Sequence, residues 1–127
     1  MACIPFQTND KLYRSCHKMY FDDIYKDSPE SVFLPTEVDE GKLSVQPKKG
    51  RLDHNIKEYF KSTLRSFNNH VGYYTFFVDD CHAKNITCCD ETVLPNYFHA
   101  IIECGNDKKT RLLTAEYLYS KAQFVKY

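Results

Sequence analysis

The densest group of chemically active side chains lies in residues 81–104. It comprises four cysteines and two histidines: Cys81, His82, Cys88, Cys89, His99 and Cys104. A tetrahedral zinc site needs four thiolate or imidazole ligands. The spacing matches no zinc knuckle, and adjacent ligands point to opposite sides of an extended chain. We therefore predict no metal site, with Cys81, Cys88, Cys89 and His99 as the ligands to test.

Nucleophilic catalysis would need a base beside the nucleophile, with a third group to orient that base. The sequence offers only the neighbouring pairs Cys16-His17 and Cys81-His82, whose spatial relation is not fixed by their adjacency. It contains no Gly-rich phosphate loop, no His-Glu-x-x-His and no Gly-x-Ser-x-Gly. The sequence therefore predicts no catalytic residues and no cofactor.

The composition narrows the class of partner. The 127 residues include 17 Lys and Arg and 17 Asp and Glu, and the basic residues form no broad cluster. Direct binding of nucleic acid is therefore not expected. Ten Tyr and nine Phe with no Trp fit a large core or an adhesive surface.

The start of the chain lacks a leader pattern, and no stretch is long enough to span a membrane. We therefore expect an intracellular protein of the nucleus or cytoplasm, with mostly reduced cysteines.

Three segments have the pattern of helices. Apolar residues at helical spacing predict a first helix that Asn9 or Asp10 caps and that ends near Asp27, and Ser28-Pro29-Glu30 starts a brief one that Pro35 ends. The longest is 53–70, where Ile56, Tyr59, Phe60, Leu64 and Phe67 form one apolar stripe.

Strands are expected at Leu43–Val45, 73–78, 97–104, 110–119 and 122–127, because apolar, β-branched and aromatic residues alternate there or form short runs. The chain then reads as a single domain, 1–127, with a lead segment 1–9 and long loops at 36–50 and 79–95. The predicted fold is α+β, with a curved antiparallel sheet wrapped on one face by the long helix and the two N-terminal helices.

This order of elements resembles the nuclear transport factor 2-like superfamily, and most of all the small partner subunit of messenger RNA export receptors. The resemblance is carried by Met19-Tyr20-Phe21-Asp22-Asp23, by Ile56-Lys57-Glu58-Tyr59-Phe60 after a glycine turn, and by Asp80-Cys81. It implies a cone-shaped fold. In enzymes of that shape an Asp or His works inside the cone, which makes Asp22, Asp23 and His99 the candidates here. A cystatin-like fold is the runner-up, although the inhibitor's Gln-x-Val-x-Gly loop is absent.

The helices can cover only one face of such a sheet, so the other face is the candidate site. We predict a non-catalytic protein-protein interaction module that pairs as a homodimer, or as a heterodimer with a related domain. The resemblance adds a role as an adaptor in nuclear transport or RNA export. The alternatives are a small-molecule-binding enzyme that uses the cone interior and a cystatin-like inhibitor. The predicted interface consists of Tyr97, His99, Ile101, Glu103, Thr114, Glu116 and Leu118.

Overall fold

The fold was analysed in a computed structural model that describes residues 3–22, 25–36, 40–95 and 97–127. The strands are β1 (Lys11–His17), β2 (Lys42–Pro47), β3 (His70–Phe77), β4 (Cys88–Asp90), β5 (Ala100–Glu103) and β6 (Gln123–Lys126). The α-helices are α1 (Asp53–Thr63), α2 (Val78–His82) and α3 (Lys108–Lys121). Short 3-10 helices are η1 (Lys18–Phe21), η2 (Pro29–Phe33) and η4 (Phe67–Asn69).

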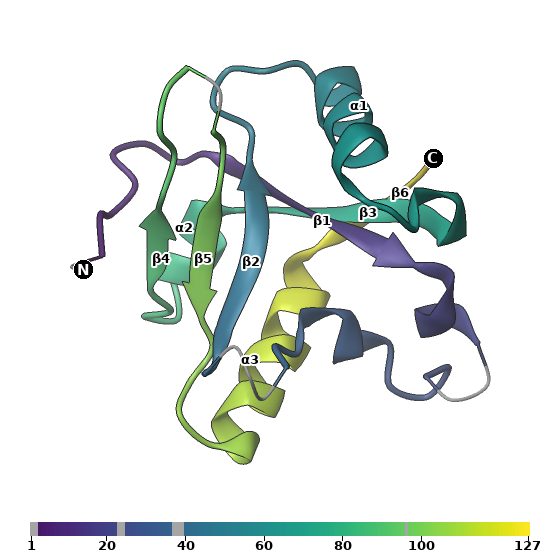
Figure 1. Ribbon diagram of the computed structural model, residues 1–127. Helices are drawn as coiled ribbons and strands as arrows, with labels where there is room; N and C mark the ends of the chain where they lie inside the picture. The colour runs from purple at the N-terminus through teal and green to yellow at the C-terminus, as the bar shows by residue number, and fades with distance from the viewer. Residues whose placement is uncertain (1–2, 23–24, 37–39, 96) are drawn as a thin grey trace.

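The strands form one antiparallel sheet in the order β4-β5-β2-β1-β3-β6, which confirms the α+β class and the antiparallel sheet. Strand β2 pairs with β1 at only two positions, Leu12 with Pro47 and Tyr13 with Gln46. Figure 1 shows the consequence: β4, β5 and β2 run side by side, while β1 and β3 cross them steeply. The two halves of the sheet therefore diverge next to β2.

Helices cover both faces of the sheet, so the prediction that they lie on one face is wrong. The larger core cluster joins Phe33 of η2 and Leu118 of α3 to Phe76 of β3 and Ile102 of β5. On the opposite face, a smaller cluster packs α1 against β1 and β3. Helix α1 packs on the β1–β3 half of the sheet (Figure 1), and no helix of the described residues lies on the α1-facing side of β2 and β5.

Residues 11–17 form strand β1 where we predicted a helix. Leu12 and Cys16 enter the larger core and Tyr13 enters the smaller one, so apolar side chains occupy both faces of the strand. Such two-sided burial gives an apolar spacing that also fits a helix. Asp10 does not cap a helix: its carboxylate accepts hydrogen bonds from the backbone N–H groups of Lys11 and Lys49. Ile24, part of the predicted stripe, lies outside the described residues.

The second error is at 110–119, where helix α3 replaces the predicted strand. Asp107 caps this helix by accepting a hydrogen bond from the backbone N–H of Thr110 at 2.8 Å. Ala115 and Leu118, three residues apart, are its buried contacts with the sheet. The local alternation of apolar and polar residues was therefore misleading, whereas the capping residue and the helix-forming Lys, Leu and Ala residues were the better signal.

The remaining predicted elements are largely confirmed. Strands are present at β2, β3, β5 and β6, and η2 is the brief helix that precedes Pro35. Helix α1 ends at Thr63, before the predicted end, but its whole predicted apolar stripe packs into the smaller core. The predicted loop 79–95 contains most of α2 and all of β4, which its polar sequence did not indicate.

Candidate functional site

The structure divides the predicted interface. Thr114, Glu116 and Leu118 lie on α3, and Leu118 is buried in the same core as Ile102. Ile101 points away from that core, because neighbouring residues of a strand face opposite sides. The seven predicted residues therefore do not form one surface. Tyr97, His99, Ile101 and Glu103 remain together on β5 and the chain that precedes it.

Three of those four residues line a groove of about 380 Å³, which we call the β5 groove. Its floor includes Ile101 and Glu103 of β5 and Lys42 of the neighbouring β2. The other lining residues come from the N-terminal segment and from the chain around β4: Cys3, Ile4, Cys89, Asp90, Glu91, Thr92, Val93 and Tyr97.

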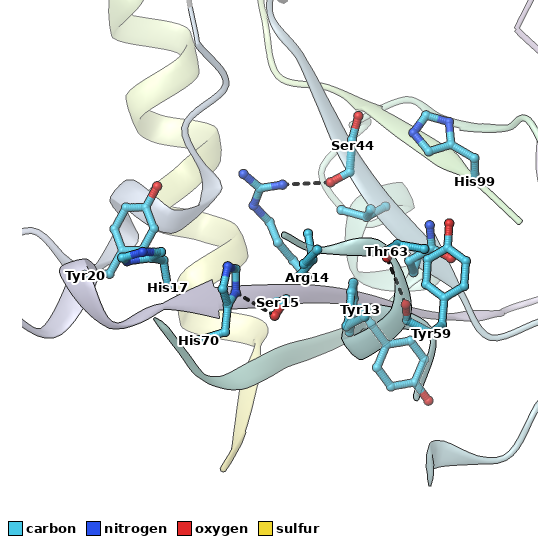
Figure 2. A pocket seen from close by; sticks show the side chains of 14 residues that line it. Tyr13, Arg14, Ser15, His17, Tyr20, Ser44, Tyr59, Thr63, His70 and His99 are labelled. Carbon is cyan, nitrogen blue, oxygen red and sulfur yellow. Dashed lines mark hydrogen bonds between the residues drawn. The ribbon is translucent and has the colours of Figure 1, made fainter. Parts of the chain in front are cut away.

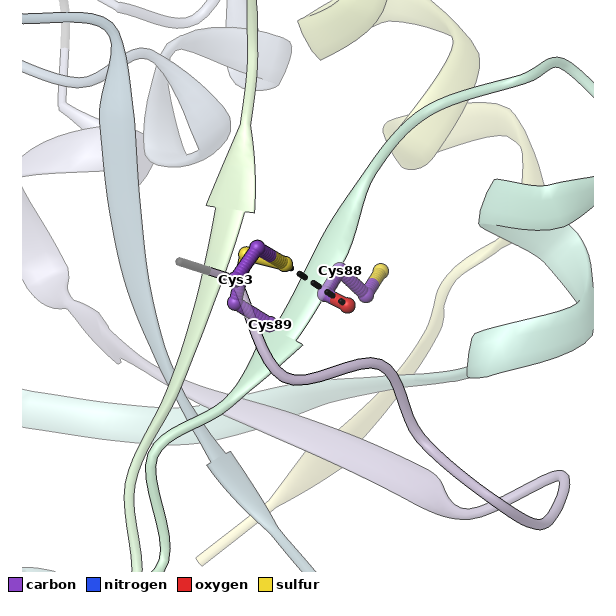
Figure 3. The surroundings of a disulfide bond; sticks show 3 residues. All are labelled: Cys3, Cys88 and Cys89. Carbon is purple, nitrogen blue, oxygen red and sulfur yellow. Dashed lines mark hydrogen bonds between the residues drawn. A yellow bond between two sulfur atoms is a disulfide. The ribbon is translucent and has the colours of Figure 1, made fainter. Parts of the chain in front are cut away.

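A disulfide bond holds one wall of the β5 groove. Cys3 is bonded to Cys89 of β4, which makes this pair the exception to the prediction of mostly reduced cysteines; Cys16, Cys81, Cys88 and Cys104 are free. The N-terminal segment runs along β4 (Figure 3), where Asp90 donates its backbone N–H to the carbonyl of Ile4 at 2.7 Å. This segment covers the outer edge of β4, and it also carries Ile4 to the rim of the groove.

Large apolar side chains are exposed around this groove. Ile4, Val93, Leu94 and Tyr97 are 63%, 65%, 72% and 52% exposed. Backbone hydrogen bonds between Val93 and Tyr97 hold the turn that presents three of them. Single exposed apolar residues are common on proteins, but several at one groove mark an association site.

The β5 groove is also acidic. Asp90, Glu91 and Glu103 line it with Lys42 as the only Lys or Arg among its described lining residues. Asp90 forms an ion pair with Lys49. A carboxylate oxygen of Glu91 lies at hydrogen-bond distance, 2.8 Å, from His99 Nδ1. Burial alone would raise the pKa of Asp90, but its hydrogen bonds with Lys49 and Thr92 hold that pKa below its usual value. The Asp90 carboxylate is therefore ionised near neutral pH.

The candidate metal ligands are not gathered at one point. Cys89 is consumed by the disulfide, and Cys81 and Cys88 are buried in the larger core. A hydrogen bond with Cys88, together with burial, raises the pKa of the Cys81 thiol far above its usual range. His99 lies beside Tyr97, with their ring centroids 5.7 Å apart. No cluster of three or more potential metal ligands occurs in the described parts of the chain.

A second hollow lies where β1 and β2 diverge, and sequence reasoning missed it because it depends on that divergence. This β1–β2 cleft has a volume of about 390 Å³ and is lined by residues of β1, β2, α1 and the start of β3, with Tyr20 and His99 at its ends. Figure 2 shows His17, Ser15 and His70 on one side, Tyr59 and Thr63 on the other, and Arg14 between them.

The cleft contains a chain of polar contacts. Ser15 Oγ lies 2.8 Å from His70 Nδ1 and 2.7 Å from the hydroxyl of Tyr127, while His70 Nε2 lies 3.3 Å from Ser66 Oγ. Both nitrogens of His70 are thus engaged. Burial, with the nearby His17 and Arg14, lowers the pKa of His70. A neutral His70 fits a scaffold that fixes Ser15 and Tyr127.

The acid-base candidates implied by the resemblance do not converge. Asp22 is exposed at the end of η1, His99 contacts Glu91, and Asp23 lies outside the described residues. Arg51 lies beside the cleft wall: its guanidinium lies 5.4 Å from the centroid of the Tyr59 ring and 4.0 Å from that of Phe98, and it donates to the Pro47 carbonyl. The two hollows are neighbours, because His99 lines the cleft and lies 2.8 Å from Glu91 of the groove.

Comparison with protein-family models found no matching family, and comparisons with curated proteins and with solved structures found no match. Among the described residues, no helix is both long enough and apolar enough to cross a membrane.

Proposed function

We propose that this protein is a non-catalytic interaction module that binds an extended, apolar and basic segment of another protein in the β5 groove. The observation that carries this proposal is the group of exposed apolar side chains, Ile4, Val93, Leu94 and Tyr97, beside a groove with three carboxylates. Apolar anchors supply affinity, and opposite charge steers a partner and fixes its register.

The dimensions favour a short segment over a second domain. A groove of about 380 Å³ accommodates a few side chains, whereas a stable pairing of two domains buries roughly 800 Å² on each partner. The edge of β4 is already occupied by the N-terminal segment, so the bound segment lies on the sheet face and does not extend the sheet.

The role in nuclear transport or RNA export remains a prediction from resemblance. Two elements on which that resemblance was built, the first helix and the last long strand, have the other secondary structure here. The β5 groove supports the wider interaction role without them.

The test uses two synthetic peptides, one alternating Lys and Leu and one in which Glu replaces each Lys. Fluorescence anisotropy of the labelled peptides should show that the Lys–Leu peptide binds and that the Glu–Leu peptide does not. Glu103→Lys should lower the affinity for the Lys–Leu peptide by about tenfold, because it reverses a charge at the groove. Val93→Ser should lower the same affinity by about fivefold, because it removes an apolar contact.

Matched controls lie on α3. Glu116→Lys makes the same charge reversal on an exposed residue, and Leu113→Ser removes an exposed apolar side chain, both away from the groove. Neither should change affinity. Equal binding of the two peptides, or equal effects of Glu103→Lys and Glu116→Lys, would contradict the proposal.

A further inference from the structure

The β1–β2 cleft differs in chemistry from the β5 groove. Its described lining includes Arg14, His17, His70 and His99 and contains no Asp or Glu. Tyr59 and Phe60 of α1 supply aromatic walls. A volume of about 390 Å³ is within the usual range of small-molecule sites. The hollow therefore has the size and the polarity for a small ligand that is not cationic.

His17 presents a free donor in this cleft. Its Nδ1 accepts the backbone N–H of Met19 at 3.0 Å and so caps η1. In the neutral ring the proton is then on Nε2. That nitrogen makes no hydrogen bond with any residue that the structure describes. A ligand oxygen is the complement of this N–H.

Gln46 presents a second donor. The side chain is only 7% exposed, and its Oε1 accepts a hydrogen bond from Arg51 Nη2 at 3.3 Å. Because Arg51 can only donate, this contact fixes which end of the amide is oxygen. The Nε2 group has no acceptor among the described residues, and it is not one of the fully buried unpaired atoms, so it is open to the cleft. The hydroxyl of Tyr20 likewise has no hydrogen-bond partner among the described residues.

From these groups we infer that the β1–β2 cleft binds a small aromatic carboxylate. A carboxylate oxygen accepts a hydrogen bond from Gln46 Nε2, and the ring packs against Tyr59, since Gln46 and Tyr59 both lie beside Arg51. His17, four residues along β1 from Tyr13, the partner of Gln46, adds its donor further along the cleft. The charge of Arg14 favours an anion over a neutral molecule, although its Nε and Nη1 are already bonded to the carbonyls of Val32 and Ser44. His70 does not contact the ligand by hydrogen bonds, because both of its nitrogens are engaged.

The probes are three molecules that share one ring system: naphthoate, naphthalenemethanol and naphthylmethylamine. Isothermal titration calorimetry near neutral pH should show that naphthoate binds at least about tenfold more tightly than the alcohol, since hydrogen bonds to a charged acceptor are the stronger ones. The amine should bind most weakly. Added salt should lower the affinity for naphthoate and leave the affinity for the alcohol unchanged.

Two neighbouring residues of α1 give a matched pair of variants. Thr63 lines the cleft and Ser62 does not, yet both are exposed and both hydroxyls donate to the carbonyl of Tyr59. Thr63→Glu should lower the affinity for naphthoate by about fivefold through charge repulsion, whereas Ser62→Glu should leave that affinity unchanged. Gln46→Glu keeps an oxygen that accepts the hydrogen bond from Arg51 but replaces the amide donor with a second oxygen, so it should weaken the affinity for naphthoate by about tenfold.

Three results would each overturn the inference. The first is no heat of binding for naphthoate at millimolar concentration with folded protein. The second is equal affinity for naphthoate and the alcohol. The third is an equal effect of Thr63→Glu and Ser62→Glu. All three leave the peptide proposal untouched, because naphthoate and the Lys–Leu peptide are assigned to different hollows.

Discussion

The two hollows lie on the same side of one sheet but have opposite polarity. The β5 groove combines exposed aliphatic side chains with three carboxylates, while the β1–β2 cleft combines aromatic walls with Arg14 and three histidines. His99 lines the cleft while its Nδ1 contacts Glu91 of the groove at 2.8 Å. The residues that separate the hollows are therefore few, and charge is what distinguishes their ligands.

Their construction differs as well. The groove is bounded by a turn and by an N-terminal segment tied to β4 through Cys3–Cys89. The cleft is bounded by regular elements, β1, β2 and α1, and by the Ser15–His70–Tyr127 contacts. A loop-built surface adapts to a flexible peptide, whereas a site on strands and a helix holds fixed donors for a small ligand.

The largest effect is expected from the two faces of β5. Ile102 is fully buried, and Ile101 is half-buried on the groove side. Ile102→Asp should unfold the protein, because burying an unpaired carboxylate costs several kcal/mol of a total stability of about 5–15 kcal/mol. Ile101→Asp should leave it folded. Circular dichroism melting curves compare the two variants, and similar losses of stability in both would show that the groove face belongs to the core.

The disulfide gives the next largest effect and separates the hollows. Cys3→Ser should lower stability by about 2–4 kcal/mol, since Cys3–Cys89 closes a loop of 86 residues. It should also lower the affinity for the Lys–Leu peptide, because one wall of the groove is no longer tied to β4, while the affinity for naphthoate stays the same. Chemical denaturation and calorimetry measure both.

A reductant supplies the control for this variant. Reduced wild-type protein should behave as Cys3→Ser does, and the variant itself should not respond to reductant. An equal loss of naphthoate affinity would mean that the N-terminal segment supports the cleft too.

The smallest effect concerns pH and His70. Its pKa in the folded protein lies below the usual 6.5, through burial and through His17 and Arg14. The unfolded chain therefore binds a proton more readily, so stability is greatest above about pH 6.5 and falls on acidification towards the lower folded pKa. Melting temperatures between about pH 7 and pH 5 should decline in wild-type protein and decline less in His70→Gln. Identical slopes would remove His70 as the cause.

The sequence predicted the elements whose pattern reflects one dominant environment. The α1 stripe from Ile56 to Phe67 and the short strand around Leu43 each pack as their periodicity indicates. β1 was misread because Leu12 and Tyr13 are both fully buried, on opposite faces, which removes the alternation of a one-sided strand. α3 was misread because its apolar residues extend beyond the buried pair Ala115 and Leu118, as the exposed Leu113 shows.

The candidate sites were less predictable than the fold. Tyr97, Ile101 and Glu103 were identified because they alternate along one strand, and that information is local. Cys3 and Ile4, which also line the groove, precede β4 by more than 80 residues and meet it through the disulfide and the backbone contacts beside it. The cleft needs His17 and His70 from the paired strands β1 and β3 and Gln46 from β2, which diverges from β1, and no local pattern encodes that geometry.

The most direct test of two independent hollows is amide chemical-shift mapping by NMR on one labelled sample. The Lys–Leu peptide should shift the amides of Ile4, Val93, Ile101 and Glu103, and naphthoate should shift those of Ser15, Gln46, Thr63 and His70. Saturation with either ligand should leave the affinity for the other unchanged. The account is contradicted if the two ligands shift the same residues, or if one displaces the other.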